Sequence, residues 1–173
     1  MRWFWIGAGA AALVLAVPAA AQSSADAALN RMYESIAAGV AANAGDAVAG
    51  AFAADAVVLD PRPGAPAEGA AFRAGIQRMA DRLKADGVTA RTEYRIVRRM
   101  VAGDLAVDTG YRHMTMATSK PGVAMPADQY HKFLVVAQRQ ADGSWKIVRD
   151  ASLPASKEAW DGAVRSAGLK FDG

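Results

Sequence analysis

Apolar residues in the first half of the chain recur at spacings of three and four, a period that predicts amphipathic helices. The first predicted helix begins at Ser24 or Asp26, either of which can cap it. A short second helix starts near residue 45, and a third spans about 69–86. Their apolar stripes are Leu29, Met32, Tyr33, Ile36 and Val40; Val48 and Phe52; and Phe72, Ile76, Met79 and Leu83.

The second half of the chain changes to a period of two, which predicts strands whose alternate residues face the same side. A loop is predicted at 61–66, because its three prolines disfavour a helix or a central strand. These elements predict an α+β domain with three N-terminal helices packed on a curved, mainly antiparallel sheet. The expected strands are a short one at 56–60 and longer ones at about 90–101, 104–118, 128–140 and 144–153.

The N-terminal segment 1–21 has the layout of a secretory signal peptide, with a positive residue, an apolar run, Pro18 and an Ala-x-Ala site. Cleavage after Ala21 would leave Gln22 as the first residue, so the sequence predicts a periplasmic or secreted protein. An uncleaved anchor is disfavoured, because Pro18 interrupts a run that is short for a membrane span. We therefore expect no membrane association after signal cleavage.

The rest of the chain is predicted to form one domain at 22–154, followed by a tail at 155–173. Trp160, Val164 and Leu169 in the tail fit one last helical turn, whereas its glycines favour a looser structure.

Composition narrows the chemistry. The 173 residues include no cysteine, which excludes disulfides, thiolate chemistry and Cys-ligated zinc. The two histidines are 18 residues apart on different predicted strands, so no metal site is predicted. No phosphate-binding loop or nucleophile elbow is present, and no cofactor is predicted. The net charge of +3 comes without a basic stripe and does not favour nucleic-acid binding.

Four segments carry a resemblance to a known family: FAADAVVLDP at 52–61, GDLAVDTGY at 103–111, YHKFLVVAQR at 130–139 and ADGSWKIVRD at 141–150. With the order of the elements, they resemble the nuclear transport factor 2-like superfamily, and within it the small bacterial SnoaL-like proteins. The resemblance implies helices that close one side of the sheet around a cone-shaped pocket. It also implies a homodimer formed through the outer face of the sheet. Members include steroid isomerases, cyclases, dehydratases, ligand-binding proteins and association domains.

Strand alternation suggests which residues face the pocket. In the strand at 104–118, Tyr111 and His113 share a face with the apolar residues at its start. If the loop at 119–127 is centred near Val123, Phe133 lies beside His113 and Val135 beside Tyr111.

The turn at 141–144 sets the register of the last two strands. It places Asp150 opposite Val135 and on the same face, with Trp145 and Ile147 on the other. His131 is expected to be structural or exposed. The candidate polar cluster is then Tyr33, Asp60, Tyr111, His113 and Asp150, and the apolar ligand contacts are Phe52, Phe133 and Val135.

Asp60 is the strongest single signal. The segment Leu59-Asp60-Pro61 resembles the part of bacterial ketosteroid isomerases that carries the catalytic base, and Tyr33 matches the position of their oxyanion-hole tyrosine. The resemblance implies Asp60 as the base. If the chain is an enzyme, Tyr33 or Tyr111 is expected to be the hydrogen-bond donor, and His113 with Asp150 a second acid or base pair. The position of that family's second oxyanion donor is apolar here. Asp60 before a proline could equally start a turn, and Tyr33 could be a core residue.

Three functions are compatible with these features. The chain is expected to bind a small, largely apolar or carbonyl-containing ligand. Alternatively, it transfers a proton next to a carbonyl as an isomerase or lyase, or it is a dimeric association module with a vestigial pocket.

Overall fold

The computed structural model describes residues 19–60, 64–122, 124–126, 128–163 and 169–172. Most of the predicted signal peptide, and Val164 of the tail, therefore lie outside the described residues. Among the helices that are described, none combines the length and the apolarity that a bilayer crossing requires.

In the described part of the chain, three helices precede the long strands: α1 (Ala19–Ala41), α2 (Gly45–Gly50) and α3 (Gly69–Ala85). The apolar stripe of α1 is buried as its spacing predicts, and Leu29 and Tyr33 are fully inaccessible to solvent. The prediction for Phe52 is wrong in one respect. Phe52 begins a strand instead of extending α2, because its backbone pairs in parallel with Ile147.

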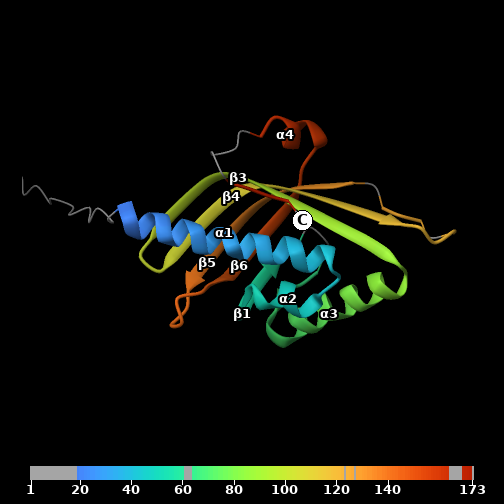
Figure 1. Cartoon of the computed structure of the whole chain (residues 1–173), viewed down its shortest axis with the longest axis horizontal. Coiled ribbons are helices and arrows are strands. Elements are labelled where there is room, and N and C mark those ends of the chain that lie inside the picture. Colours follow the sequence, from blue (N-terminus) through green and yellow to red (C-terminus); the bar gives the residue numbers. More distant parts are fainter. Residues whose placement is uncertain (1–18, 61–63, 123, 127, 164–168, 173) are drawn as a thin grey trace, which may run out of the picture.

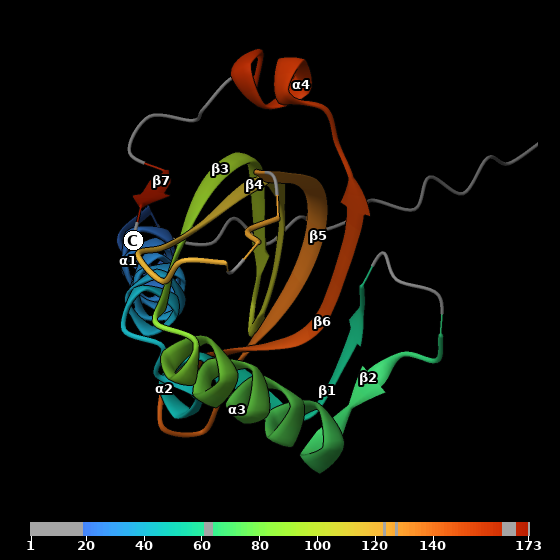
Figure 2. The ribbon, with the colours of Figure 1, turned by 90° about the vertical axis from the view of Figure 1, so that its right-hand side faces the viewer.

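The strands form one curved sheet in the order β2-β1-β6-β5-β4-β3-β7. All neighbouring pairs are antiparallel except β1 and β6. Figure 2 shows the long strands as an arc with α1 and α3 on its concave side. The α+β class with a curved, mainly antiparallel sheet is therefore confirmed. The strand bounds are β1 (Phe52–Leu59), β2 (Ala67–Glu68), β3 (Val88–Ala102), β4 (Leu105–Thr118), β5 (Gln129–Arg139), β6 (Trp145–Pro154) and β7 (Lys170–Asp172).

Gly110 of β4 lies close against the backbone of β3. A Cβ atom at this position would lie 2.1 Å from the carbonyl oxygen of Arg95, and the register of β3 shifts between Ile96 and Arg98. Such a bulge bends its strand and increases the local twist. The glycine therefore allows the backbone approach that accompanies this bend of the sheet.

The register between β4 and β5 differs from the prediction. Phe133 pairs with Gly110 and Met114 with Gln129, so the connecting loop is centred between Pro121 and Gly122. Phe133 is thus three positions from its predicted partner, His113. Because an odd shift exchanges the two faces of a strand, Tyr111 and His113 lie on the outer face, and their predicted inward orientation is wrong.

The pairing of β5 with β6 is partly as predicted. Asp150 pairs with Val135 and lies on the inner face. A bulge between these pairs and the turn changes the register, so that Ile147 pairs with Ala137 and Trp145 with Arg139. Trp145 and Ile147 are consequently buried on the inner face, not on the outer face as predicted.

The tail forms a short helix, α4 (Lys157–Asp161), and the strand β7 on the edge of β3. Figure 1 shows α4 on the side of the sheet opposite α1, α2 and α3. Trp160 of α4 lies under the Arg95 guanidinium, which is 4.1 Å from the ring centroid and donates to the Trp160 carbonyl oxygen. Arg95 thus holds α4 against the outer face.

Candidate functional site

A cavity of about 510 Å³ lies between the helices and the concave face of the sheet. Its size falls in the range of sites for small organic ligands, roughly 300–1,000 Å³. The helix side is apolar. It is lined by Ile36, Val40, Val48, Phe72, Ile76 and Leu83.

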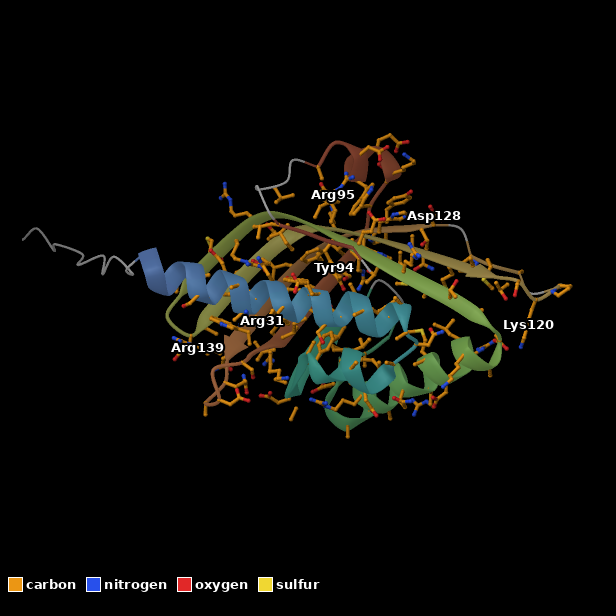
Figure 3. All side chains as sticks on the ribbon, viewed as in Figure 1. Arg31, Tyr94, Arg95, Lys120, Asp128 and Arg139 are labelled. Carbon is orange, nitrogen blue, oxygen red and sulfur yellow. The ribbon has the colours of Figure 1, made fainter. Side chains whose placement is uncertain are left out.

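The sheet side of the cavity carries polar side chains from four adjacent strands. We call this group the polar row; it consists of Thr92, Tyr94, Arg112, His131, Asp150 and Ser152. Arg112 of β4 stands at its centre, because its backbone pairs with Tyr94 on one side and with His131 on the other. Figure 3 shows Tyr94 over the middle of the sheet, while Arg95 extends toward α4. Because side chains alternate along β3, Tyr94 faces the cavity and Arg95 lies on the outer face.

Burial shapes the protonation of the polar row. It raises the pKa of the Tyr94 hydroxyl, against the charge and hydrogen bond of Arg112, so this group stays protonated at neutral pH. It lowers the pKa of His131, and the nearby Arg112 charge acts in the same direction. His131 therefore lines the cavity as a neutral imidazole near pH 7.

Asp150 is the carboxyl group of the polar row. Burial raises its pKa, while the Arg112 charge and a hydrogen bond from Ser152 act in the opposite direction. The Ser152 hydroxyl donates to Asp150 Oδ1 at 3.4 Å. Buried carboxyl groups with a raised pKa act as general acids or bases in many enzymes.

Two other predicted residues face the same cavity. Asp60 follows the last residue of β1 and is half-buried in the cavity wall. Tyr33 of α1 lies opposite the sheet, with its ring centroid 5.1 Å from that of Tyr94 and 6.4 Å from that of Phe133. Burial raises the pKa of Tyr33 well above its usual value, and the Asp108 charge adds to the effect. The predicted contacts Phe52, Phe133 and Val135 also line the cavity.

The remaining predicted residues lie elsewhere. His113 stacks on Tyr130 on the outer face, and its Nε2 atom is 3.0 Å from Asp128 Oδ2. Tyr111 borders a shallow hollow on the same face, next to Leu134 and Leu153. These positions separate His113 and Tyr111 from Asp60 and Asp150.

Sequence reasoning missed Arg112 and His131. The exposed alternative for His131 is wrong, because only 9% of the residue is accessible and it lines the cavity. Its spacing of two from Phe133 and four from Val135 was the available signal. Arg112 could not be placed without the register of β4 and β5.

A second polar cluster lies on the same face of the sheet, beyond Gly110. Arg99 forms a bidentate pair with Asp108, with distances of 2.9 Å from Nε to Oδ1 and 2.8 Å from Nη2 to Oδ2. Its Nη1 donates to Asn30 Oδ1 of α1 at 2.8 Å. Burial would lower the pKa of Arg99, but the hydrogen bonds and charge of Asp108 raise it. This cluster joins α1 to the sheet.

Within the part of the chain that the structure describes, no group of three or more His, Cys, Asp or Glu side chains could hold a metal ion.

Comparison with known proteins identifies the fold. Neither protein-family models nor curated proteins give a match to the chain. A candidate scytalone dehydratase from Novosphingobium aromaticivorans is similar with a TM-score of 0.63 and 17% identity, over 85% of this chain and 95% of that one. ActVI-ORFA from Streptomyces coelicolor gives 0.60 and 17%, over 75% of this chain and 96% of that one.

A candidate calcium/calmodulin-dependent protein kinase II association domain from Xanthomonas campestris gives a TM-score of 0.53 and 21% identity, over 82% of this chain and 94% of that one. At such identities the similarity shows the fold alone. The chain therefore shares the fold of these solved structures, which agrees with the fold that the sequence resemblance implies. That fold has hosted both enzymes and association domains, so the function must be argued from the cavity.

Proposed function

We propose that this chain binds a small, largely apolar ligand in the cavity between the helices and the sheet, as a SnoaL-like protein. The observation that carries this proposal is the asymmetry of the cavity, about 510 Å³ in volume, with an apolar helix side and a polar row on the sheet. Binding sites commonly combine an apolar wall with a few polar groups that fix the orientation of the ligand.

A fluorescence and absorbance titration tests this proposal. The purified protein is titrated with apolar carbonyl compounds, including steroids, and both binding and turnover are followed. Saturable binding by at least one compound is expected. Phe72 lines the apolar side, so Phe72→Asp should abolish that binding, whereas the substitution Ala71→Asp at the exposed neighbouring position should not. Failure of every compound to bind would contradict the proposal and favour an association module.

A proton-transfer enzyme is the second candidate. Two carboxyl groups, Asp60 and Asp150, line one cavity together with the side chains of Tyr33 and Tyr94. A carboxylate that takes a proton next to a carbonyl, with a protonated tyrosine donating to the resulting enolate, is a workable arrangement. Asp60 remains the proposed base, and Asp150 replaces His113 as the group that could share this role.

Paired substitutions test the enzyme. Asp60→Asn and Asp150→Asn preserve the size of each side chain and remove its ability to take a proton. Turnover that is lost in one variant while ligand affinity persists would identify the base. Binding without turnover in the unchanged protein would leave a ligand-binding protein and exclude these compounds as substrates.

We further propose a homodimer through the outer face of the sheet. Leu134 and Leu153 are 43% and 57% exposed there, beside the hollow bordered by Tyr111. Exposed apolar side chains gathered on one face favour association. Sedimentation analysis should show a dimer that Leu134→Lys dissociates, whereas Thr89→Lys, an exposed position near one end of β3, should leave it intact. A monomeric unchanged protein would contradict this proposal.

Export is proposed from the N-terminal segment alone. Cell fractionation should find the protein outside the cytoplasm, and N-terminal sequencing should begin at Gln22. An intact N-terminus on the cytoplasmic protein would contradict export and cleavage.

A further inference from the structure

Two atoms at the centre of the polar row lack the partners that buried polar groups normally have. Arg112 Nε and His131 Nδ1 are both inaccessible to solvent and make no hydrogen bond with any described residue. Buried polar atoms are nearly always paired with protein or ordered water, so each exception needs an explanation. The polar row holds three such atoms, the third being Thr92 Oγ1. Arg112 and His131 are neighbours, because they are directly paired across β4 and β5.

Both side chains line the cavity instead of the close-packed core. His131 is more than nine-tenths buried, so bulk water does not compensate for its missing partner. Leaving such groups unsatisfied costs free energy, more so when one of them is charged. The position of these groups in the cavity wall means that a molecule inside the cavity can supply the missing bonds.

The charge of Arg112 is also not matched by an ion pair. Among the described residues, the ion pairs of the inner face are those of Arg99, whereas Arg112 forms none. Asp150 lies close enough for its pKa to be affected by Arg112, but its side-chain hydrogen bond comes from Ser152. The guanidinium therefore presents to the cavity a positive charge that forms no ion pair.

A carboxylate is the ligand group that fits this arrangement. Its two oxygens offer about four lone-pair sites, and a guanidinium binds a carboxylate through two parallel N–H groups. The Nδ1 atom of neutral His131 can donate a third hydrogen bond when that atom carries the proton. A molecule without hydrogen-bonding groups would leave Arg112 Nε and His131 Nδ1 without a partner.

Resting on the proposed function, we infer that the ligand is a monocarboxylate whose head group binds Arg112 and His131 and whose apolar body lies against Ile36, Phe72 and Ile76. The cavity volume of about 510 Å³ is sufficient for a medium-chain or bicyclic acid. The polar row thereby selects for charge, and the helix side selects for apolar bulk.

The experiment compares acids with amides of the same shape. Decanoate and 1-naphthylacetate are tested by calorimetry against decanamide and 1-naphthylacetamide, using protein purified after expression of the full chain. The neutral dye Nile red reports cavity binding that does not depend on a head group. Each acid should bind about 10- to 100-fold more tightly than its amide, as expected for charge-assisted hydrogen bonds, and should displace the dye.

Two arginine substitutions locate the head group. Arg112→Met should remove the preference for acids over amides and leave Nile red binding intact. Arg98→Met is the matched control, because Arg98 is exposed on β3 and outside the cavity lining, and this variant should retain the preference. Circular dichroism checks that both variants fold. If Arg112→Met does not fold, Arg112→Lys serves instead and should weaken the preference.

The possible outcomes separate this inference from the proposed function. Nile red binding with equal affinities for acids and amides would overturn the carboxylate inference and leave apolar-ligand binding standing. Equal loss of preference in Arg98→Met would overturn the role of Arg112. If neither Nile red nor any probe binds, both the inference and the proposed function are overturned.

Discussion

Two arginines on neighbouring strands of one sheet face have opposite environments in this fold. Arg99 is 5% exposed, and its guanidinium is bound by Asp108 and by Asn30 of α1. Arg112 lines the cavity, forms no ion pair with any described residue and leaves Nε without a partner. The first arginine is a structural connection, whereas the second is available to a ligand.

Their positions along β4 explain the difference. Asp108, Gly110 and Arg112 alternate on its inner face, with Gly110 beside the bulge of β3. On the Asp108 side, α1 approaches the sheet and supplies Asn30. On the Arg112 side, the helices stand away from the sheet and leave the cavity. The comparison shows that burial alone does not indicate a structural role; the partners of a buried charge must be counted.

The largest effect is expected from removing the counter-ion of Arg99. Asp108→Ala should lower the free energy of unfolding by about 3–5 kcal/mol, because it leaves Arg99 buried without its counter-ion. Urea denaturation measures this loss. Asp108→Leu combined with Arg99→Met should recover much of it, since no unpaired charge remains. A loss below about 1 kcal/mol in Asp108→Ala would contradict the structural role.

An intermediate effect is expected at Gly110, which lies between Asp108 and Arg112 on the inner face of β4. Gly110→Ala should cost about 1–3 kcal/mol of unfolding free energy, because the new Cβ atom would collide with the Arg95 carbonyl and force β3 away. Gly50→Ala is the matched control. A Cβ atom there meets nothing within 4 Å, so thermal unfolding should show little change or a gain in stability. Equal effects at both positions would show that the close approach is unimportant.

A smaller effect is expected from removing the charge of Arg112. Arg112→Met should lower the free energy of unfolding by less than about 1 kcal/mol, because it removes a buried charge that has no ion-pair partner to leave behind. Urea denaturation beside Asp108→Ala makes the contrast direct. A cost close to that of Asp108→Ala would mean that Arg112, too, is mainly structural.

The smallest effect concerns pH. Burial raises the pKa of Asp150 in the folded state, so the unfolded chain loses this proton first as pH rises. Stability linked to Asp150 is therefore present below the ordinary aspartate pKa and is lost as pH rises through the folded-state pKa. Asp150→Asn should lack this loss, so its stability relative to the unchanged protein should increase from acidic to neutral pH. Denaturation at several pH values measures the difference, and a constant difference would contradict the raised pKa.

The amino-acid sequence determined the elements and much of the inner face. The helical stripe turned Tyr33 inward, and the strand that ends at Leu59 brought Asp60 to the cavity wall. These features are local, because a period, a turn residue or a loop length is sufficient to specify each of them.

Tertiary structure alone decided which polar side chains meet. The odd shift across the loop at 119–127 exchanged His113 for Arg112 on the inner face, and the bulge in β6 turned Ile147 inward. Neither event has a signature in the residues themselves, because register depends on how whole strands pack against the helices. The same is true of partners. Only the folded chain gives Arg99 its carboxylate and leaves Arg112 facing the cavity, since those contacts join residues from separate elements.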